Sequence, residues 1–316
     1  MRALGLLALA ALIAACDTQY DPCFGTAMKV ADLRVLAVRS DPPEVVFDPA
    51  AATIPPVTVS MLMADPRTGI TDIFNAEVAA CPQTDDKRCA PGSLHVASVA
   101  QAGPVISFPV QVTPALLQAA LDADPLRGYG GIRVQVDIQL TGTFSRSTRA
   151  TKTLLFTPAK AGYVPNHSFE ILGLNLTIKG YPMGFYATGD IVSVQVADQI
   201  GVIPLLAPTS GDGDAAEDYD VVDLAGNPVH LKEHISYSLY STVHGRFLSD
   251  TAEQPPQGVL PTLLDGVFKF QSTLAASGRL YVVARDGRGA VAWFTTPWAS
   301  VETRGGRQPN LELDCE

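Results

Sequence analysis

The sequence predicts an all-β protein built from two β-sandwich domains in tandem. Short runs in which apolar and polar residues alternate recur along the chain, and turn-forming residues separate them. The 24 prolines and 26 glycines disfavour long helices. Of the 316 residues, 47% are hydrophobic and 17% are charged, so the chain can bury two cores of ordinary domain size.

Residues 30–158 are predicted to form the first domain. Its opening run, Leu33 to Arg39, reads as a strand, and Asp41-Pro42-Pro43 ends it because proline cannot donate to a strand ladder. Further strands are expected at 57–63, 70–80, 95–99, 105–112, 132–140 and 151–156. About seven short strands joined by turns are typical of an immunoglobulin-like sandwich.

One helix is expected in this domain, over Ala115–Leu121. Thr113 suits the N-cap, because its hydroxyl can accept from a free backbone N–H of the first turn. Pro114 suits the first helical position, where a missing N–H leaves no hydrogen bond unmade.

Residues 159–168 are predicted to be a linker, residues 169–303 a second sandwich of the same class, and residues 304–316 a tail. Strands are expected at 169–172, 174–178, 191–196, 200–206, 220–224, 235–241, 266–270, 280–285 and 290–294. Asp286-Gly287-Arg288-Gly289 should form the hairpin turn between the last two strands, because glycine tolerates positive φ.

Residues 1–15 are predicted to be an export signal. Arg2 precedes a short apolar run that is too short to span a bilayer permanently, which needs about 20 apolar residues. Ile13-Ala14-Ala15-Cys16 resembles the lipobox of bacterial lipoproteins. This resemblance implies that the Cys16 thiol is acylated, as by palmitate, and that residues 16–29 form a lipidated tether. An ordinary secretory signal that happens to meet a cysteine is the alternative.

Two further segments resemble known sandwich domains. Residues 280–294, a valine-rich strand followed by an Asp-Gly turn and an aromatic strand, resemble the end of a PKD-type or bacterial Ig-like domain. Residues 33–45 resemble the first strand of such domains in uncharacterised bacterial lipoproteins. The resemblance implies the fold and no activity, because sandwiches host many unrelated functions.

The remaining four cysteines suggest two disulfides, as expected of an exported protein. Cys81 and Cys89 bracket a polar run and are expected to pair locally, which leaves Cys23 to pair with Cys315. A zinc site is the alternative, but Cys-x7-Cys does not match the usual ligand spacing of two to four residues.

The net charge of −10 argues against a nucleic-acid partner, which needs a basic stripe, and against adsorption to anionic lipid. Attachment to the membrane is therefore expected through the lipid on Cys16. A protein or glycan partner is left open. The location expected is the bacterial cell envelope, either at the surface or on the periplasmic face of the outer membrane. Asp17 leaves retention in the inner membrane open.

The densest acidity lies between Thr209 and Asp220. Asp212, Asp214, Glu217 and Asp218 supply the oxygen ligands that Ca²⁺ prefers, although their spacing departs from the EF-hand. A solvated loop explains the same residues. No other cofactor is expected.

A recognition surface is predicted at Tyr181, Phe185 and Tyr186. These aromatics lie in a segment rich in glycine and proline, which we expect to be a loop unable to bury all of them. Packing in a core is the alternative, since aromatic side chains bury large apolar areas.

No catalytic residue is predicted. The chain has no Gly-x-Ser-x-Gly, and His230 and His234 would lie about 13 Å apart on a strand, too far for one metal ion. The sequons at Asn166 and Asn175 are interpreted as coincidence in a bacterial lipoprotein. The sequence therefore favours a non-enzymatic recognition or scaffolding role. The alternatives are an enzyme or ligand-capture protein with a loop-built site, and a calcium-dependent adhesion module.

Overall fold

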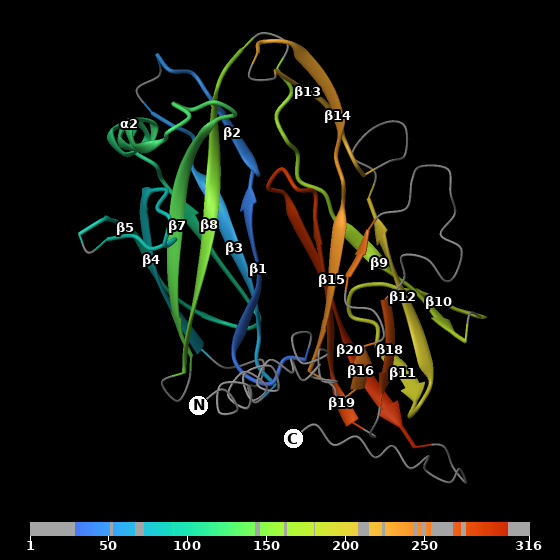
Figure 1. Ribbon diagram of the computed structural model, residues 1–316. Helices are drawn as coiled ribbons and strands as arrows, with labels where there is room; N and C mark the ends of the chain where they lie inside the picture. The colour runs from blue at the N-terminus through green and yellow to red at the C-terminus, as the bar shows by residue number, and fades with distance from the viewer. Residues whose placement is uncertain are drawn as a thin grey trace, which may run out of the picture.

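The computed structural model confirms an all-β chain of two immunoglobulin-like β-sandwiches (Figure 1). It describes residues 29–50, 53–66, 73–90, 92–142, 146–160, 163–179, 181–207, 215–222, 225–242, 245–247, 251–253, 268–272 and 276–302. Within these ranges, no helix is long and apolar enough to cross a membrane.

The first sandwich packs a three-stranded sheet, ordered β1-β3-β6, against a five-stranded sheet, ordered β2-β8-β7-β4-β5. Its strands are β1 (Arg34–Asp41), β2 (Glu44–Phe47), β3 (Val57–Ala64), β4 (Ile73–Pro82), β5 (Leu94–Ala102), β6 (Val105–Val110), β7 (Ile132–Thr141) and β8 (Ser147–Pro158). Alternation explains the core: the buried members of β7 include Ile132, Val134, Val136, Ile138 and Leu140.

The predicted helix is confirmed as α2 (Pro114–Ala123). The Thr113 hydroxyl accepts from the backbone N–H of Leu116 at 3.2 Å, as an N-cap should. Leu117 and Ala120, one helical turn apart, are buried in the core of the first sandwich.

The second sandwich packs sheet β10-β9-β12-β18-β16 against sheet β11-β20-β19-β15-β17, and a separate hairpin, β13-β14, is attached to it. Its strands are β9 (Ile171–Ile178), β10 (Tyr181–Tyr186), β11 (Val192–Gln195), β12 (Gln199–Leu206), β13 (Asp218–Val222), β14 (Pro228–Lys232), β15 (Ser236–Ser241), β16 (Gly245–Phe247), β17 (Thr251–Glu253), β18 (Phe268–Ser272), β19 (Ala276–Arg285) and β20 (Val291–Val301).

The segment expected to be an aromatic loop is a strand, so that expectation was wrong. Tyr181–Tyr186 forms edge strand β10, antiparallel to β9, with a register shift between Pro182 and Gly184. An edge strand needs hydrogen bonds on one side only, so it tolerates the proline that made the segment look like a loop.

The two sandwiches lie side by side rather than end to end (Figure 1). The outer face of sheet β1-β3-β6 packs on the outer face of the sheet that holds β19 and β20, so four sheets are stacked. The side chains buried between them form what we call the interface core: Val30, Leu36, Ala37, Leu62, Ala64, Tyr281 and Val283.

Strand β1 serves two cores because its register shifts between Val35 and Ala37 where it pairs with β3. A bulge of this kind turns an extra residue to one face of the strand. As a result, the consecutive residues Leu36 and Ala37 both enter the interface core, while Val35 and Val38 pack against the core of the first sandwich.

Candidate functional site at the junction of the sandwiches

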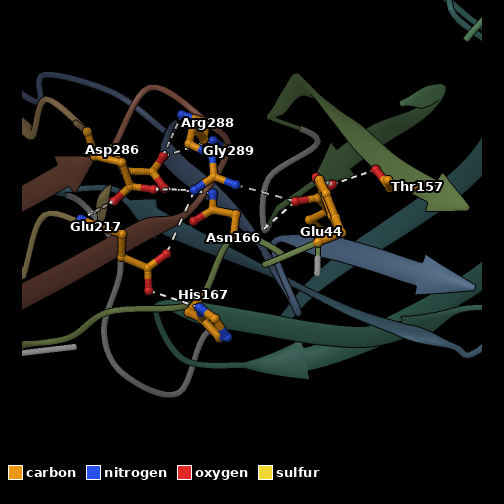
Figure 2. Close-up of polar contacts among 10 residues, drawn as sticks. Glu44, Thr157, Asn166, His167, Glu217, Asp286, Arg288 and Gly289 are labelled. Atoms are coloured by element: carbon orange, nitrogen blue, oxygen red, sulfur yellow. Dashed lines mark hydrogen bonds and ion pairs between the residues drawn. The ribbon is translucent and has the colours of Figure 1, made fainter. Parts of the chain in front are cut away.

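A cluster of charged and amide side chains lies beside the interface core, and Figure 2 shows how they face one another. Three are provided by strand ends: Glu44 begins β2, Glu217 precedes β13 and Glu233 follows β14. We call the full set the junction cluster; it consists of Glu44, Asn166, Glu217, Glu233, Asp286 and Arg288.

The turn between β19 and β20 presents Arg288. Asp286 Oδ1 accepts from the backbone N–H of Arg288 and of Gly289, each at 2.8 Å, which fixes the turn as predicted for these residues. Gly287 and Gly289 have φ of +82° and +127°, a region that favours glycine. The turn therefore holds the Arg288 side chain in one direction.

Arg288 lies among three carboxylates. It donates to Glu233 Oε1 at 3.0 Å, and its guanidinium nitrogens lie 3.8 Å from Glu217 Oε2 and 3.6 Å from Glu44 Oε2. The guanidinium also lies 4.2 Å from the centre of the Tyr219 ring, a cation–π contact. One cation thus joins the first sandwich to hairpin β13-β14.

Glu44 is a buried acceptor, with 3% of its surface exposed. The hydroxyls of Thr157 and Tyr163 donate to its Oε1, and the backbone N–H of Asn166 donates to Oε2 at 2.9 Å. Burial, followed by the hydrogen bond to Glu44, raises the pKa of Tyr163 to about 12. The Glu44 carboxylate therefore ties the first sandwich to the segment that leads into the second.

Asn166 extends this chain of contacts to the second sandwich. Its side-chain amide donates to Asp286 Oδ2 at 2.7 Å, and both residues are 2% exposed. The neighbouring His167 contacts Glu217 through Nδ1 at 2.9 Å. The connecting segment is therefore held on both sides by the sandwiches that it joins.

The junction cluster brings three carboxylates around one guanidinium, with the Asp286 carboxylate close by in the same turn as Arg288. Burial, with the negative charges of Asp286 and Glu217 adding to it, raises the pKa of Glu233 to about 7, although Arg288 opposes the shift. Among the described residues, no group of three or more histidine, cysteine, aspartate or glutamate side chains is placed to hold a metal ion. The arrangement can therefore hold two domains together and take up a proton near neutral pH.

The disulfide predicted between Cys81 and Cys89 is confirmed, with the two Cα atoms 5.6 Å apart. Cys16, Cys23 and Cys315 lie outside the described residues, so the lipid and the second disulfide stay predictions.

The predicted calcium ligands are only partly described. Asp212 and Asp214 lie outside the described residues. Glu217 is directed to Arg288 and His167, and Asp218 begins β13, where His230 lies 3.8 Å away. The calcium site stays a prediction.

The three predicted recognition residues differ in exposure. Tyr181 and Phe185 are 76% and 50% exposed on β10, whereas Tyr186 is half-buried against the core of the second sandwich. The Phe185 ring lies over Gly173 of β9, because a Cβ added there would come within 2.5 Å of the ring. No bound partner tests the predicted role of these aromatics.

Sequence reasoning missed the junction cluster. The sequence places Asn166 in a sequon within the linker and Arg288 in a turn, and indicates no partner for either. The sequence offers one local signal for this cluster. Arg288 stands between two glycines in a predicted tight turn, which indicates that its side chain extends away from the turn and is free to contact other elements. Nothing in one sequence, however, pairs it with Glu44, which is 244 positions away.

No family model matches the chain, and no curated protein matches it. Solved structures similar to it include red sea bream transglutaminase (10% identity, TM-score 0.23), covering 88% of this chain and 33% of that one. The fibronectin(III)-like modules of Clostridium thermocellum CbhA are also similar (8% identity, TM-score 0.21), covering 87% of this chain and 99% of that one. The periplasmic chaperone SfaE is similar too (9% identity, TM-score 0.26), covering 84% of this chain and 100% of that one. The chain thus spans one third of the transglutaminase chain, and TM-scores this low carry nothing about activity.

Proposed function

We propose that this chain is an exported, lipid-anchored scaffold of the bacterial cell envelope, without enzymatic activity, whose two sandwiches act as one rigid body. The observation that carries the proposal is the junction, where an apolar face and a buried polar cluster hold the same two sandwiches together. A protein or glycan partner would bind loops or edge strands that this rigid body holds in fixed relative positions.

The interface core supplies most of the free energy that holds the two sandwiches together. Each large apolar side chain that leaves water on packing contributes about 1.5–3 kcal/mol, and the interface core contains several of them. Two cation–π contacts join the same sheets: Arg39 lies 4.4 Å from the Trp293 ring centre, and Arg34 lies 5.6 Å from that of Tyr240.

The junction cluster fixes the orientation of one sandwich relative to the other. Hydrogen bonds are directional, so the contacts of Asn166 and Arg288 are satisfied at one relative placement of the sandwiches. Rotation at the junction would separate Asp286 Oδ2 from the Asn166 amide and Glu44 from Arg288, and a buried acceptor that loses its donor costs about 1–3 kcal/mol or more if it is charged.

Two features support export and tethering. The Cys81–Cys89 disulfide is typical of proteins that fold in an oxidising compartment. Near the N-terminal side of the first sandwich, the backbone N–H of Val30 donates to Ser241 O of the second sandwich at 2.8 Å. A lipid on Cys16 would therefore tether the chain at a point where it contacts both sandwiches.

Scattering and calorimetry test the rigid body. We expect a single unfolding transition and a radius of gyration near 20 Å, the value of about 2.2·N^0.38 Å for one compact body of this length. Arg288→Ala should separate the transitions or enlarge the particle, whereas Lys160→Ala, at an exposed position of the linker, should change neither. Two transitions and a longer particle in the unmodified protein would overturn the proposal.

Mass spectrometry and membrane fractionation test the anchor. The mature protein should begin at Cys16, carry a diacyl or triacyl adduct and sediment with membranes. Cys16→Ser should lose both the adduct and the sedimentation, while Cys23→Ser, seven positions downstream, should keep them. An unmodified Cys16 in the wild-type protein would remove the anchor from the proposal.

A further inference from the structure

A cavity of about 500 Å³ opens beside the junction cluster. Its walls are residues 35–38 of β1, residues 149–152 of β8 and the turn between β19 and β20. This volume lies within the range of about 300–1,000 Å³ that is typical of small-ligand sites.

The cavity exists because two strand edges face each other without pairing. Strand β1 is the edge of its sheet, and β8 pairs with β2 only along Leu155–Pro158. Along residues 149–152, the described strands leave that edge of β8 unpaired. The second sandwich covers the opening with its β19–β20 turn.

Two cationic side chains line this cavity and contact only neutral groups within the described part of the chain. Lys152 Nζ donates to Gly289 O at 2.7 Å. Arg285 donates to Leu36 O at 3.2 Å and to Ser238 Oγ at 3.3 Å.

The acidic groups nearby are already engaged. Asp286 accepts from two backbone N–H groups and from Asn166, as described above. Asp137 accepts from the guanidinium of Arg149, the third basic residue of the wall. The charges of Lys152 and Arg285 therefore lack a carboxylate in direct contact.

The unfavourable burial of positive charge is reflected in the pKa of Lys152. Burial, with a smaller contribution from the positive charge of Arg285, lowers the pKa of Lys152 to about 8, although Asp286 opposes the shift. A negatively charged group beside the ammonium would offset that cost, because it favours the charged form.

The remaining walls decide what kind of anion fits. Val35, Val38, Ala150 and Val291 are apolar, while polar groups make up a similar share of the accessible wall, so only part of a bound molecule would contact hydrocarbon. A phosphate would need several more donors. A carboxylate has only two oxygens, so the ammonium of Lys152 and the remaining N–H groups of Arg285 can satisfy it.

We propose that this cavity binds a ligand with one carboxylate and a short apolar body, the carboxylate lying between Lys152 and Arg285 and the body against the valine and alanine side chains. The carboxylate belongs either to a free organic acid or to the C-terminus of a peptide. This site goes beyond the scaffolding role and does not depend on the lipid anchor.

Calorimetric titration of the full chain carrying Cys16→Ser tests the proposal with three probes. Hexanoate represents a free acid, N-acetyl-Val-Val a peptide carboxylate, and N-acetyl-Val-Val-amide the same peptide without the charge. We expect one or both acids to bind and the amide to bind at least tenfold more weakly. The tighter acid identifies the source of the carboxylate.

Matched variants locate the binding. Lys152→Gln and Arg285→Gln should each weaken the binding of the acid at least tenfold, whereas Lys160→Gln, an equal change of charge at an exposed position, should leave it unchanged. Equal binding of the acid and the amide, or binding that neither cavity variant weakens, would overturn the proposal.

The rate at which Lys152 is acetylated in the wild-type protein provides a second measurement if a variant fails to fold. A bound carboxylate should raise the pKa of Lys152 and so slow its acetylation at pH 8, while acetylation of Lys160 stays unchanged. No binding of either acid at millimolar concentration, together with unchanged acetylation of Lys152, would remove the site.

Discussion

The side-chain amide of Asn166 donates to Asp286 Oδ2 at 2.7 Å and links the connecting segment to the last hairpin of the second sandwich. Both side chains are buried, so neither can replace its partner with water. This contact makes the segment between the domains part of the packed structure rather than a free linker.

Replacing Asn166 should therefore destabilise the whole protein. We expect Asn166→Ala to lower the free energy of unfolding by about 1–3 kcal/mol, the cost of a buried acceptor left without its donor. Asn166→Asp should cost more at pH 7, because it places a second carboxylate against Asp286. Urea denaturation measures both, with Asn75→Ala on the exposed side of β4 as control. Equal effects of the two substitutions at pH 7 would contradict this account of the contact.

Glu233 should make stability depend on pH. Its pKa is raised from 4.5 to about 7 in the folded protein, so the folded state binds this proton more tightly than the unfolded state does. The resulting stabilisation is complete below pH 4.5 and is lost as the pH rises to about 7. Denaturation at pH 5, 6, 7 and 8 should show falling stability, and Glu233→Gln should flatten the trend.

The matched control for that series is Glu302→Gln, at an exposed position after β20, which should follow the wild-type trend. A Glu233→Gln protein whose stability falls as steeply as that of the wild type would show that other groups control the pH dependence.

The Cys81–Cys89 disulfide should contribute about 2–3 kcal/mol, the chain-entropy value for a closed loop of eight residues. The double substitution Cys81→Ser/Cys89→Ser should lower the free energy of unfolding by that amount, and reduction of the wild-type protein should give the same loss. A double variant as stable as the oxidised wild type would contradict the predicted contribution of the disulfide.

Substitutions of Phe185 and Tyr181 on β10 should differ in their effect on the free energy of unfolding, because Phe185 is packed and Tyr181 is exposed. Phe185→Ala should cost about 1–2 kcal/mol, because the ring covers Gly173 and loses part of its burial. Tyr181→Ala should change stability by less than about 0.5 kcal/mol, since the side chain is 76% exposed. Thermal denaturation of the two single variants checks this; equal losses would contradict the assigned packing.

The sequence predicts the strands well where one face is buried and the other is wet. Strand β6 is the clear case, because its buried residues Ile106, Phe108 and Val110 alternate with the exposed Ser107 and Pro109. The cap of α2 is predicted for a similar reason: Thr113 and Pro114 act within one turn of the chain.

The contact between the sandwiches could have been anticipated in part. In β3, Met61, Leu62 and Met63 are apolar in succession, which indicates a strand buried on both faces. The structure places the methionines in the first core and Leu62 in the interface core. The sequence does not say which second surface covers Leu62, because that depends on residues more than 200 positions away.

The charged contacts could not be predicted at all. Glu44, Glu233 and Arg288 occur among many acidic and basic residues of ordinary appearance, and only the fold brings them together. Their chemistry depends on burial, which no local pattern of charges reveals.

The bulge in β1 has a consequence for anyone who wishes to dissect the molecule. A fragment ending at residue 158 would keep all eight strands of the first sandwich, yet Leu36, Leu62 and Ala64 would then face solvent. Such an exposed apolar sheet face favours self-association. The smallest soluble piece of this protein is therefore expected to be the pair of sandwiches, although each resembles a module that could be expressed by itself.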